Sequence, residues 1–436
     1  MMDAAAPNLD DRLAAMMNIA EKQAKKWNLP HAVSVPGMQP QQFRRRVFST
    51  GLTSLDVKLK IGGYPRGSIV EFYGPPHAGK TLELYLVISE VQHQCMKCEG
   101  RVDYRDRLDA KGNPVVVMVP MLVRGESTEV PVVQRTSTCR YCNAADSGGL
   151  FVLFDQENSF DPIWAARQNI ELTKFGVFKL PTGQHATEML RMLMLQIKPD
   201  AIGIDSIAQL QPKTEQLKSE VDDAIMPGLH ARVMALLCRQ ITSIFLMDPT
   251  NAPLVLWVNQ VRADMTGHGA DKVTGGFAPE HYSAIRIKLL PQQLVNQLKP
   301  EQGRNGKMTI KKCKVAEGLY NQTLEYIILP SGFDTALDLY LTAVAKNVFL
   351  STAILSGGHF WADDTDRVNK LASKKDEAIA LIRSSSTFAD EVRERVLKNT
   401  EFELPSQEIY IGDGATFDEA GDESDAEELI AVGDPE

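Results

Sequence analysis

The chain of 436 residues has few cysteines, few tryptophans and no long apolar run. Six cysteines are too few to form a disulfide scaffold for a secreted protein of this size. No apolar stretch is long enough to span a bilayer, and no basic segment followed by an apolar one marks a secretory signal. We therefore expect a cytoplasmic protein of two or three domains without a membrane partner.

An excess of basic residues is also missing, since the formal net charge is −9. The acids are unevenly placed, because residues 413–436 carry ten of them and no lysine or arginine. The rest of the chain is near neutral, at +1. This composition predicts a disordered acidic tail over 406–436. Two interpretations stay open: a device for solubility, or a DNA mimic that competes for the basic surface of the protein itself.

One octapeptide fits the phosphate-binding pattern G-x-x-x-x-G-K-[ST]. It consists of Gly74, Pro75, Pro76, His77, Ala78, Gly79, Lys80 and Thr81. An apolar run over 67–73 predicts a buried strand before it, and helical spacing over 82–91 predicts a helix after it. In that context backbone N–H groups face a phosphate at a helix N-terminus. Lys80 would reach the β- and γ-phosphates of ATP, and Thr81 would bind Mg²⁺.

Four of the six cysteines form two C-x-x-C pairs, a pattern typical of tetrahedral zinc sites. They are Cys95, Cys98, Cys139 and Cys142. The pairs lie further apart than in a compact zinc ribbon, and apolar runs at 114–120 and 130–133 between them favour short strands. Disulfides are the competing interpretation, which a cytoplasmic location disfavours. Because four thiolates leave no open coordination position, we expect a structural Zn²⁺.

Three further apolar runs each end in acids or amides. Residues 149–154 lead to Asp155 and Glu157, residues 200–204 lead to Asp205, and residues 254–258 lead to an Asn-Gln pair. The carboxyl ends of parallel strands are where ligands of such sheets bind. Each run alone could be an ordinary strand end with a capping side chain. Three in series behind a phosphate loop predict the rest of a nucleotide site.

With these segments in register, the chain resembles the RecA family of homologous-recombination proteins. Residues 49–67 are similar to the family's approach to the phosphate loop, and 155–164 to its catalytic segment. The resemblance implies an α/β fold: a RecA-type P-loop ATPase core with a mainly parallel sheet. It implies that Glu157 orients the attacking water, with Lys80 and Gln260 as the other catalytic residues, and that Gln260 couples the γ-phosphate to DNA binding.

The same resemblance implies further contacts to ATP and Mg²⁺. Asp161 would contact adenine, and Trp164 would stack on it where the family usually has tyrosine. Asp205 and Ser206 match the strand that holds magnesium.

The resemblance also places two DNA-binding loops, at 212–232 and from 262 to about 274, the latter closed by two glycines. Neither loop is strongly basic, so backbone N–H groups would supply part of the phosphate contacts. Aliphatic side chains of the first loop would wedge between bases. The alternative for the second loop is an ordinary surface loop. The residues implied for DNA contact are Ile225, Met226, Arg232, Arg262, Lys272, Gly275 and Gly276.

Two departures from the family pattern stand out. Glu280 occupies the place of a lysine that reaches the ATP of the neighbouring subunit, which puts that contact in question. Lys312 and Lys314 do match the family's other lysine pair at the subunit boundary. The cysteine-bearing insertion is absent from typical members. It marks a divergent branch, and a phage-encoded protein acting in an infected bacterial cell is one interpretation.

The expected organisation has five parts. An amphipathic helix and a linker occupy 1–40, and the ATPase core occupies 41–330. A zinc-ribbon-like insertion at 92–148 interrupts the core. A small α+β C-terminal domain occupies 331–405, and the acidic tail occupies 406–436. Because a solitary helix is marginally stable, the N-terminal helix must dock on something, and the resemblance implies that this is the neighbouring subunit.

The function implied is that of an ATP-dependent recombinase. It would form a helical homo-oligomeric filament on single-stranded DNA, pair it with double-stranded DNA and exchange strands. Recombination mediators or a single-strand-binding protein would be further partners. Two alternatives stay open: a motor or branch-migration ATPase resembling the RadA type, and a DNA-coating filament protein with weak hydrolysis.

Deletion of residues 413–436 should raise the affinity for double-stranded DNA, most at low salt, because ten negative charges are removed and screening weakens their effect. The measurement is duplex affinity of full-length and truncated protein across a salt series. Equal affinities at every salt concentration would leave the tail a solubility device.

Overall fold

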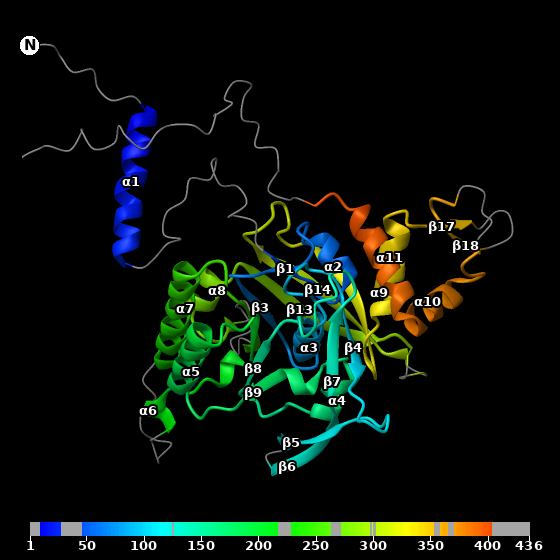
Figure 1. Ribbon diagram of the computed structural model, residues 1–436, viewed down its shortest axis with the longest axis horizontal. Coiled ribbons are helices and arrows are strands. Elements are labelled where there is room, and N and C mark those ends of the chain that lie inside the picture. Colours follow the sequence, from blue (N-terminus) through cyan, green and yellow to red (C-terminus); the bar gives the residue numbers. More distant parts are fainter. Residues whose placement is uncertain are drawn as a thin grey trace, which may run out of the picture.

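The structure is a computed structural model in which a β-rich insertion interrupts an α/β core and a smaller C-terminal unit follows that core (Figure 1). It describes residues 9–27, 46–123, 126–216, 228–262, 272–296, 299, 302–352, 358–364 and 370–402. The predicted acidic tail therefore lies outside the described residues.

A 10-stranded sheet forms the centre of the core. In spatial order its strands are β16 (Gly332–Phe333), β15 (Thr323–Leu329), β14 (Arg304–Cys313), β13 (Ile285–Leu294), β3 (Ile69–Gly74), β11 (Leu254–Arg262), β10 (Ala201–Asp205), β8 (Phe151–Asp155) and β9 (Phe175–Phe178), with β12 (Lys272–Val273) paired to the end of β11. The strands from β13 to β9 run parallel, and β14 to β16 continue antiparallel. The predicted α/β fold with a mainly parallel core sheet is confirmed.

Helices cover both faces of the sheet, because its central strands are apolar on both sides. Alternate residues point to opposite faces, so Leu256 belongs to one buried cluster and its neighbour Trp257 to another. The helix α3 (Lys80–Gln92) packs on the first face, and α5 (Gly183–Gln196) and α7 (Leu229–Met247) pack on the second. The strand and helix predicted around the phosphate loop are β3 and α3.

Helix α7 is long and apolar enough to cross a membrane by length and composition, although the sequence analysis found no such run. Its residues Met234, Leu237 and Ile241 are buried in the cluster that lines the sheet. This packing is that of a core helix of an α/β domain.

Short elements complete the core and its entrance. They are β1 (Val47–Phe48), α2 (Thr53–Lys58), β2 (Tyr64–Pro65), α4 (Pro162–Arg167), α6 (Lys213–Gln216) and α8 (Phe277–Tyr282), with short 3₁₀ turns at Leu172–Lys174 and Ile207–Gln209. The N-terminal helix α1 (Leu9–Trp27) stands apart from all of them in Figure 1. Its Met16 and Ile19 are more than half exposed.

In the segment expected to form a C-terminal domain, the described residues after β16 form three helices and one hairpin. They are α9 (Thr335–Ala345), β17 (Phe349–Thr352), β18 (Gly358–Trp361), α10 (Lys375–Ser384) and α11 (Ser386–Lys398). They enclose their own core, in which Ala343, Val392 and Val396 are fully buried.

The insertion between α3 and β8 contains two antiparallel pairs. Strands β4 (Val102–Asp106) and β7 (Arg135–Cys139) form one pair, and β5 (Val116–Val123) and β6 (Glu126–Val133) form a hairpin beyond it. The predicted strands at 114–120 and 130–133 correspond to this outer hairpin. Sequence reasoning missed β4 and β7, which adjoin the cysteines.

Replacing Leu84 by alanine should destabilise the core by about 2–5 kcal/mol, because its fully buried side chain fills the space between α3 and Gly203 of β10. The measurement is the free energy of unfolding in urea. Leu236→Ala is the control, because Leu236 on α7 is 40% exposed and should cost much less. Equal losses for the two variants would contradict this packing.

Candidate nucleotide site and metal centre

The phosphate loop joins β3 to α3 and depends on glycine at both ends. Gly79 has φ +86°, and a Cβ there would lie 2.8 Å from Cδ1 of Ile328. A Cβ on Gly74 would lie 2.1 Å from the carbonyl oxygen of Leu289. The Lys80 ammonium donates to the Pro75 carbonyl at 2.8 Å, so the lysine folds back over the loop. This places a cation beside the backbone turn where the sequence predicts the phosphates.

The predicted polar strand ends come together because their strands are adjacent and in register. Gln260 pairs with Gly74, and Asp205 pairs with Asp155, across the parallel ladders. The Thr81 hydroxyl donates to Asp205 at 2.7 Å. The predicted magnesium ligands therefore touch each other directly.

The carboxylate of Glu157 is held by two of the other predicted residues. Its Oε1 accepts from the Ser206 hydroxyl at 2.7 Å and from the Gln260 amide at 2.5 Å. Backbone N–H groups of Gln156 and Glu157 donate to the Asp205 carbonyl at 2.6 and 3.1 Å. A carboxylate fixed in this way can accept a hydrogen bond from a water and orient it.

The electrostatics of the site favour a divalent cation. Burial, followed by the neighbouring charges of Glu157 and Asp155, raises the pKa of Asp205 to about 7. Its Oδ1 is buried without a hydrogen-bond partner among the described residues. Burial lowers the pKa of Lys80, the cation beside these acids. An orphaned carboxylate oxygen next to the Thr81 hydroxyl fits the oxygen ligands that Mg²⁺ takes.

The predicted adenine platform is built at the start of α4. Asp161 caps the helix, since its Oδ1 accepts from the N–H groups of Ile163 and Trp164 at 2.8 and 3.1 Å. The partly buried Trp164 ring packs against Tyr85 of α3, with ring centroids 5.2 Å apart. The Tyr85 ring therefore holds the indole in place. The contact of Asp161 with adenine stays a prediction.

Sequence reasoning missed Lys179, which lies at the end of β9. Its ammonium pairs with the buried Asp155 carboxylate at 3.3 Å and with the side chain of Asn158. These contacts fix the turn that carries Glu157. The signal was absent from the sequence because Lys179 and Asp155 meet only through the pairing of β8 with β9.

The residues expected at a subunit boundary make contacts within the chain. Lys312 donates to the Glu280 and His281 carbonyls at the end of α8, and Lys314 donates to His281 at 3.1 Å. Glu280 forms an ion pair with Arg286 at 2.9 Å. Arg286 in turn pairs with Glu71, which is fully buried on β3. The acid at position 280 is thus engaged in its own subunit.

The predicted DNA-binding loops are described only at their bases. Ile225 and Met226 lie outside the described residues, and the side chains of Arg262 and Lys272 are likewise not described. Arg232 is exposed on the first turn of α7. The two backbones approach each other closely, since a Cβ on Gly276 would lie 2.9 Å from Ala231, and one on Gly275 would lie 3.3 Å from Met234. The bases of the two loops therefore pack together.

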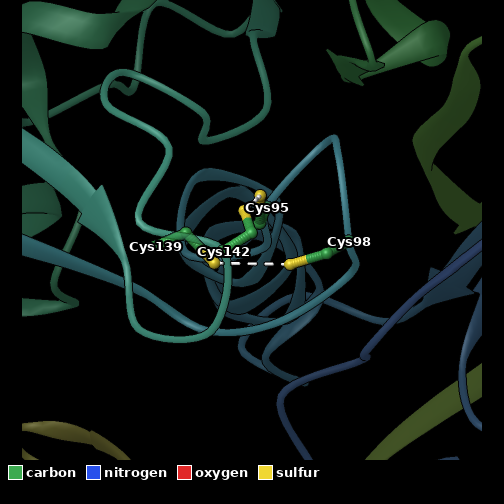
Figure 2. Close-up of side chains that lie close together, drawn as sticks. All are labelled: Cys95, Cys98, Cys139 and Cys142. Carbon is green, nitrogen blue, oxygen red and sulfur yellow. Dashed lines mark hydrogen bonds between the residues drawn. The ribbon is translucent and has the colours of Figure 1, made fainter.

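The four predicted cysteine ligands converge from two loops of the insertion (Figure 2). Their sulfur atoms all lie within 4.8 Å of one another, with 3.4 Å between Cys98 and Cys139 and 3.7 Å between Cys95 and Cys142. These separations exceed the ~2.05 Å of a disulfide. They approach the ~3.8 Å expected between sulfurs that each lie ~2.3 Å from a tetrahedral Zn²⁺. The donor set therefore fits zinc.

The two knuckles have the same local geometry. The N–H groups of Lys97 and Tyr141 each approach the first sulfur of their knuckle at 3.4 Å. Glu99 and Asn143 each follow the second cysteine with positive φ, +63° and +54°, and each donates back to the carbonyl of the first cysteine. This repetition orients two thiols of each knuckle toward a common centre.

Comparison with known proteins gives one family and many relatives. The family model of the RecA N-terminal domain matches residues 15–114 and 134–334, which leaves out both strands of the outer hairpin. The Protein RecA of Thermus thermophilus is 26% identical over 396 residues, 90% of this chain and 96% of that protein. That of Corynebacterium efficiens is 26% identical over 436 residues, 97% and 94% of the two chains. That of Halalkalibacterium halodurans is 24% identical over 411 residues, 92% and 98%.

Gently purified protein should contain one Zn²⁺ per chain, measured by elemental analysis. Cys98→Ser and Cys142→Ser should each lower this zinc content. Cys238→Ser should not, because Cys238 is buried on α7, outside the cluster of four cysteines. Structural zinc contributes about 10–16 kcal/mol in small domains, so a chelator should unfold the insertion and spare the ATPase core. Substoichiometric metal in the wild type would refute the site.

Proposed function

Because this chain belongs to the RecA family, we propose that it is an ATP-dependent DNA recombinase. It forms filaments on single-stranded DNA, pairs that strand with homologous double-stranded DNA and exchanges strands in recombination and repair. Its site of action is the bacterial cytoplasm, including that of a phage-infected cell, with mediators or a single-strand-binding protein as further partners. The proposal extends the family-level inference of DNA and ATP binding to a specific activity.

The observation that carries the proposal is the pairing of Glu157 with both Ser206 and Gln260. Glu157 holds the nucleophilic water and accepts its hydrogen bond, while Lys80 offsets charge on the transferring phosphoryl group. Gln260 lies two residues before the end of β11, where the second predicted DNA loop begins. A single carboxylate thus connects the nucleotide site to the base of that loop, as a DNA-dependent ATPase requires.

The cofactors proposed are Mg²⁺ at the nucleotide and Zn²⁺ in the insertion. Thr81 and Asp205 would hold Mg²⁺, which supplies charge neutralisation between the β- and γ-phosphates. The four cysteines would hold Zn²⁺ as a structural ion. Trp164 would bind the adenine ring on its exposed face.

A second candidate function is a DNA-coating filament protein with weak hydrolysis. The ion pair between Glu280 and Arg286 favours it, because an acid held within its own subunit cannot replace a lysine that reaches a neighbouring ATP. Strand exchange measured beside the ATPase rate separates the two. Electron microscopy with an ATP analogue and single-stranded DNA then tests for a helical filament against a closed ring.

Lys80→Ala should abolish ATP binding, whereas Glu157→Gln should keep binding and reduce DNA-dependent hydrolysis by about 10²–10⁴-fold, because water positioning is lost but the phosphate cradle stays. Nucleotide affinity and steady-state phosphate release are the measurements. The control is Glu188→Gln, an exposed acid on α5. Wild-type turnover in Glu157→Gln would move the catalytic base to another residue.

A further inference from the structure

The zinc-binding insertion contacts the C-terminal helix α11 through the two residues inside its second knuckle and, at the longer distance of 3.8 Å, through Arg101 to Asp390. Arg140 and Tyr141 lie between Cys139 and Cys142 in the chain. The Arg140 guanidinium pairs with Asp390 of α11 at 2.6 Å, and the Tyr141 hydroxyl donates to Glu394. Asp390 and Glu394 are four residues apart and so share one face of α11. That face is therefore directed at the knuckle.

Arg140 is also fixed from the side of the insertion. Its Nε and Nη2 atoms lie 2.7 Å from carboxylate oxygens of Asp103 on β4. The arginine thus bridges two acids, one in the ribbon and one in α11. Because its side chain is about a quarter exposed, its position depends on these partners and on the backbone of the knuckle.

A second set of ion pairs joins the same helix to the ATPase core without involving the cysteines. Arg393 of α11 pairs with Asp56 at 2.9 Å and with Glu90 of α3 at 3.1 Å. Arg101, which follows the first knuckle, pairs with Glu90 at 3.0 Å. Burial alone would raise the pKa of Glu90, but Arg101 and Arg393 lower it to about 2, so the carboxylate stays charged.

The two knuckles differ in what they contact. The first is tied to the core, since Glu99 pairs with Arg46 at 3.3 Å and the Arg46 guanidinium donates to the Met96 sulfur at 3.5 Å. The second reaches α11. A metal ion held by both would therefore connect an anchor on the core to a contact on the C-terminal helices. Without it, the exposed Cys98 and Cys142 are held by the contacts of their sulfurs with Cys139 and Cys95 and by short backbone turns.

We propose that the zinc-bound second knuckle is a strut that holds the C-terminal helices α9–α11 against the ATPase core, and that loss of the metal releases this contact. The proposal rests on the zinc site proposed above. It assigns the insertion a partner within the same chain: the acidic face of α11 at Asp390 and Glu394. The Arg393 pairs remain when zinc is lost, so release loosens α11 without detaching it.

The test is hydrogen–deuterium exchange of the full-length protein, zinc-loaded and chelator-treated, with zinc content measured on the same samples. Exchange at α11 should be about two- to fivefold faster for Arg140→Ala than for wild type, as for the loss of a partly exposed pair. Chelation should produce at least this increase in wild type. Amides of the buried strand β11 serve as the internal check that the core stays folded.

The decisive comparison combines the two changes. In chelated protein Arg140→Ala should cause no further increase in hydrogen exchange at α11, because the knuckle no longer contacts that helix. Arg135→Ala is the matched control: Arg135 is on the same ribbon and pairs with Asp106 and Glu171, away from α11.

Several outcomes would overturn the strut. An unchanged rate of hydrogen exchange at α11 in zinc-loaded Arg140→Ala would show that the contact does not restrain α11. An effect of Arg140→Ala that is equal with and without zinc would show a contact independent of the metal. A protein that contains no zinc but responds to Arg140→Ala would refute the metal site and the metal dependence of the contact, and would leave only a metal-independent contact between the knuckle and α11.

Discussion

Burial of α3 against the central sheet is the constraint on which the other parts depend. The helix is buried along most of its length, with Leu84, Val87 and Ile88 fully enclosed. This packing therefore fixes the position of its first residues, Lys80 and Thr81, relative to the carboxyl ends of the strands. Its last turns are fixed as well, and the first knuckle begins directly after them. One buried helix positions the nucleotide site at one end and the metal centre at the other.

The nucleotide site is a consequence of parallel strands in register. Neighbouring parallel strands end at the same edge, so acids and amides far apart in the chain become neighbours without any dedicated connection. Glu157 shows the result, since it accepts from residues 49 and 103 positions away. The cost is a concentration of buried acids, which a cation must offset. The Mg²⁺ ion proposed at Thr81 and Asp205 would supply this positive charge.

The helix α3 also fixes the position of the insertion. It departs from the end of α3 and returns to β8, so its ends are fixed by two core elements. The charges that surround it form a chain from Asp56 through Arg393 and Glu90 to Arg101, with Arg140 and Asp103 at its end. Partly exposed pairs of this kind contribute little one by one and more as a network. Their arrangement gives the insertion a defined orientation toward α11.

The sequence by itself determined the local features: the phosphate loop, the two C-x-x-C pairs, the apolar strands and the polar residues at their ends. These follow from short-range patterns, because glycine, cysteine spacing and hydrophobic periodicity act within a few residues. Only the tertiary structure decided which of them meet. Lys179 joins Asp155 through strand pairing, β4 and β7 form beside the cysteines, and Arg140 meets Asp390 across 250 positions. Such contacts carry no local signature, since they depend on how the elements pack in space.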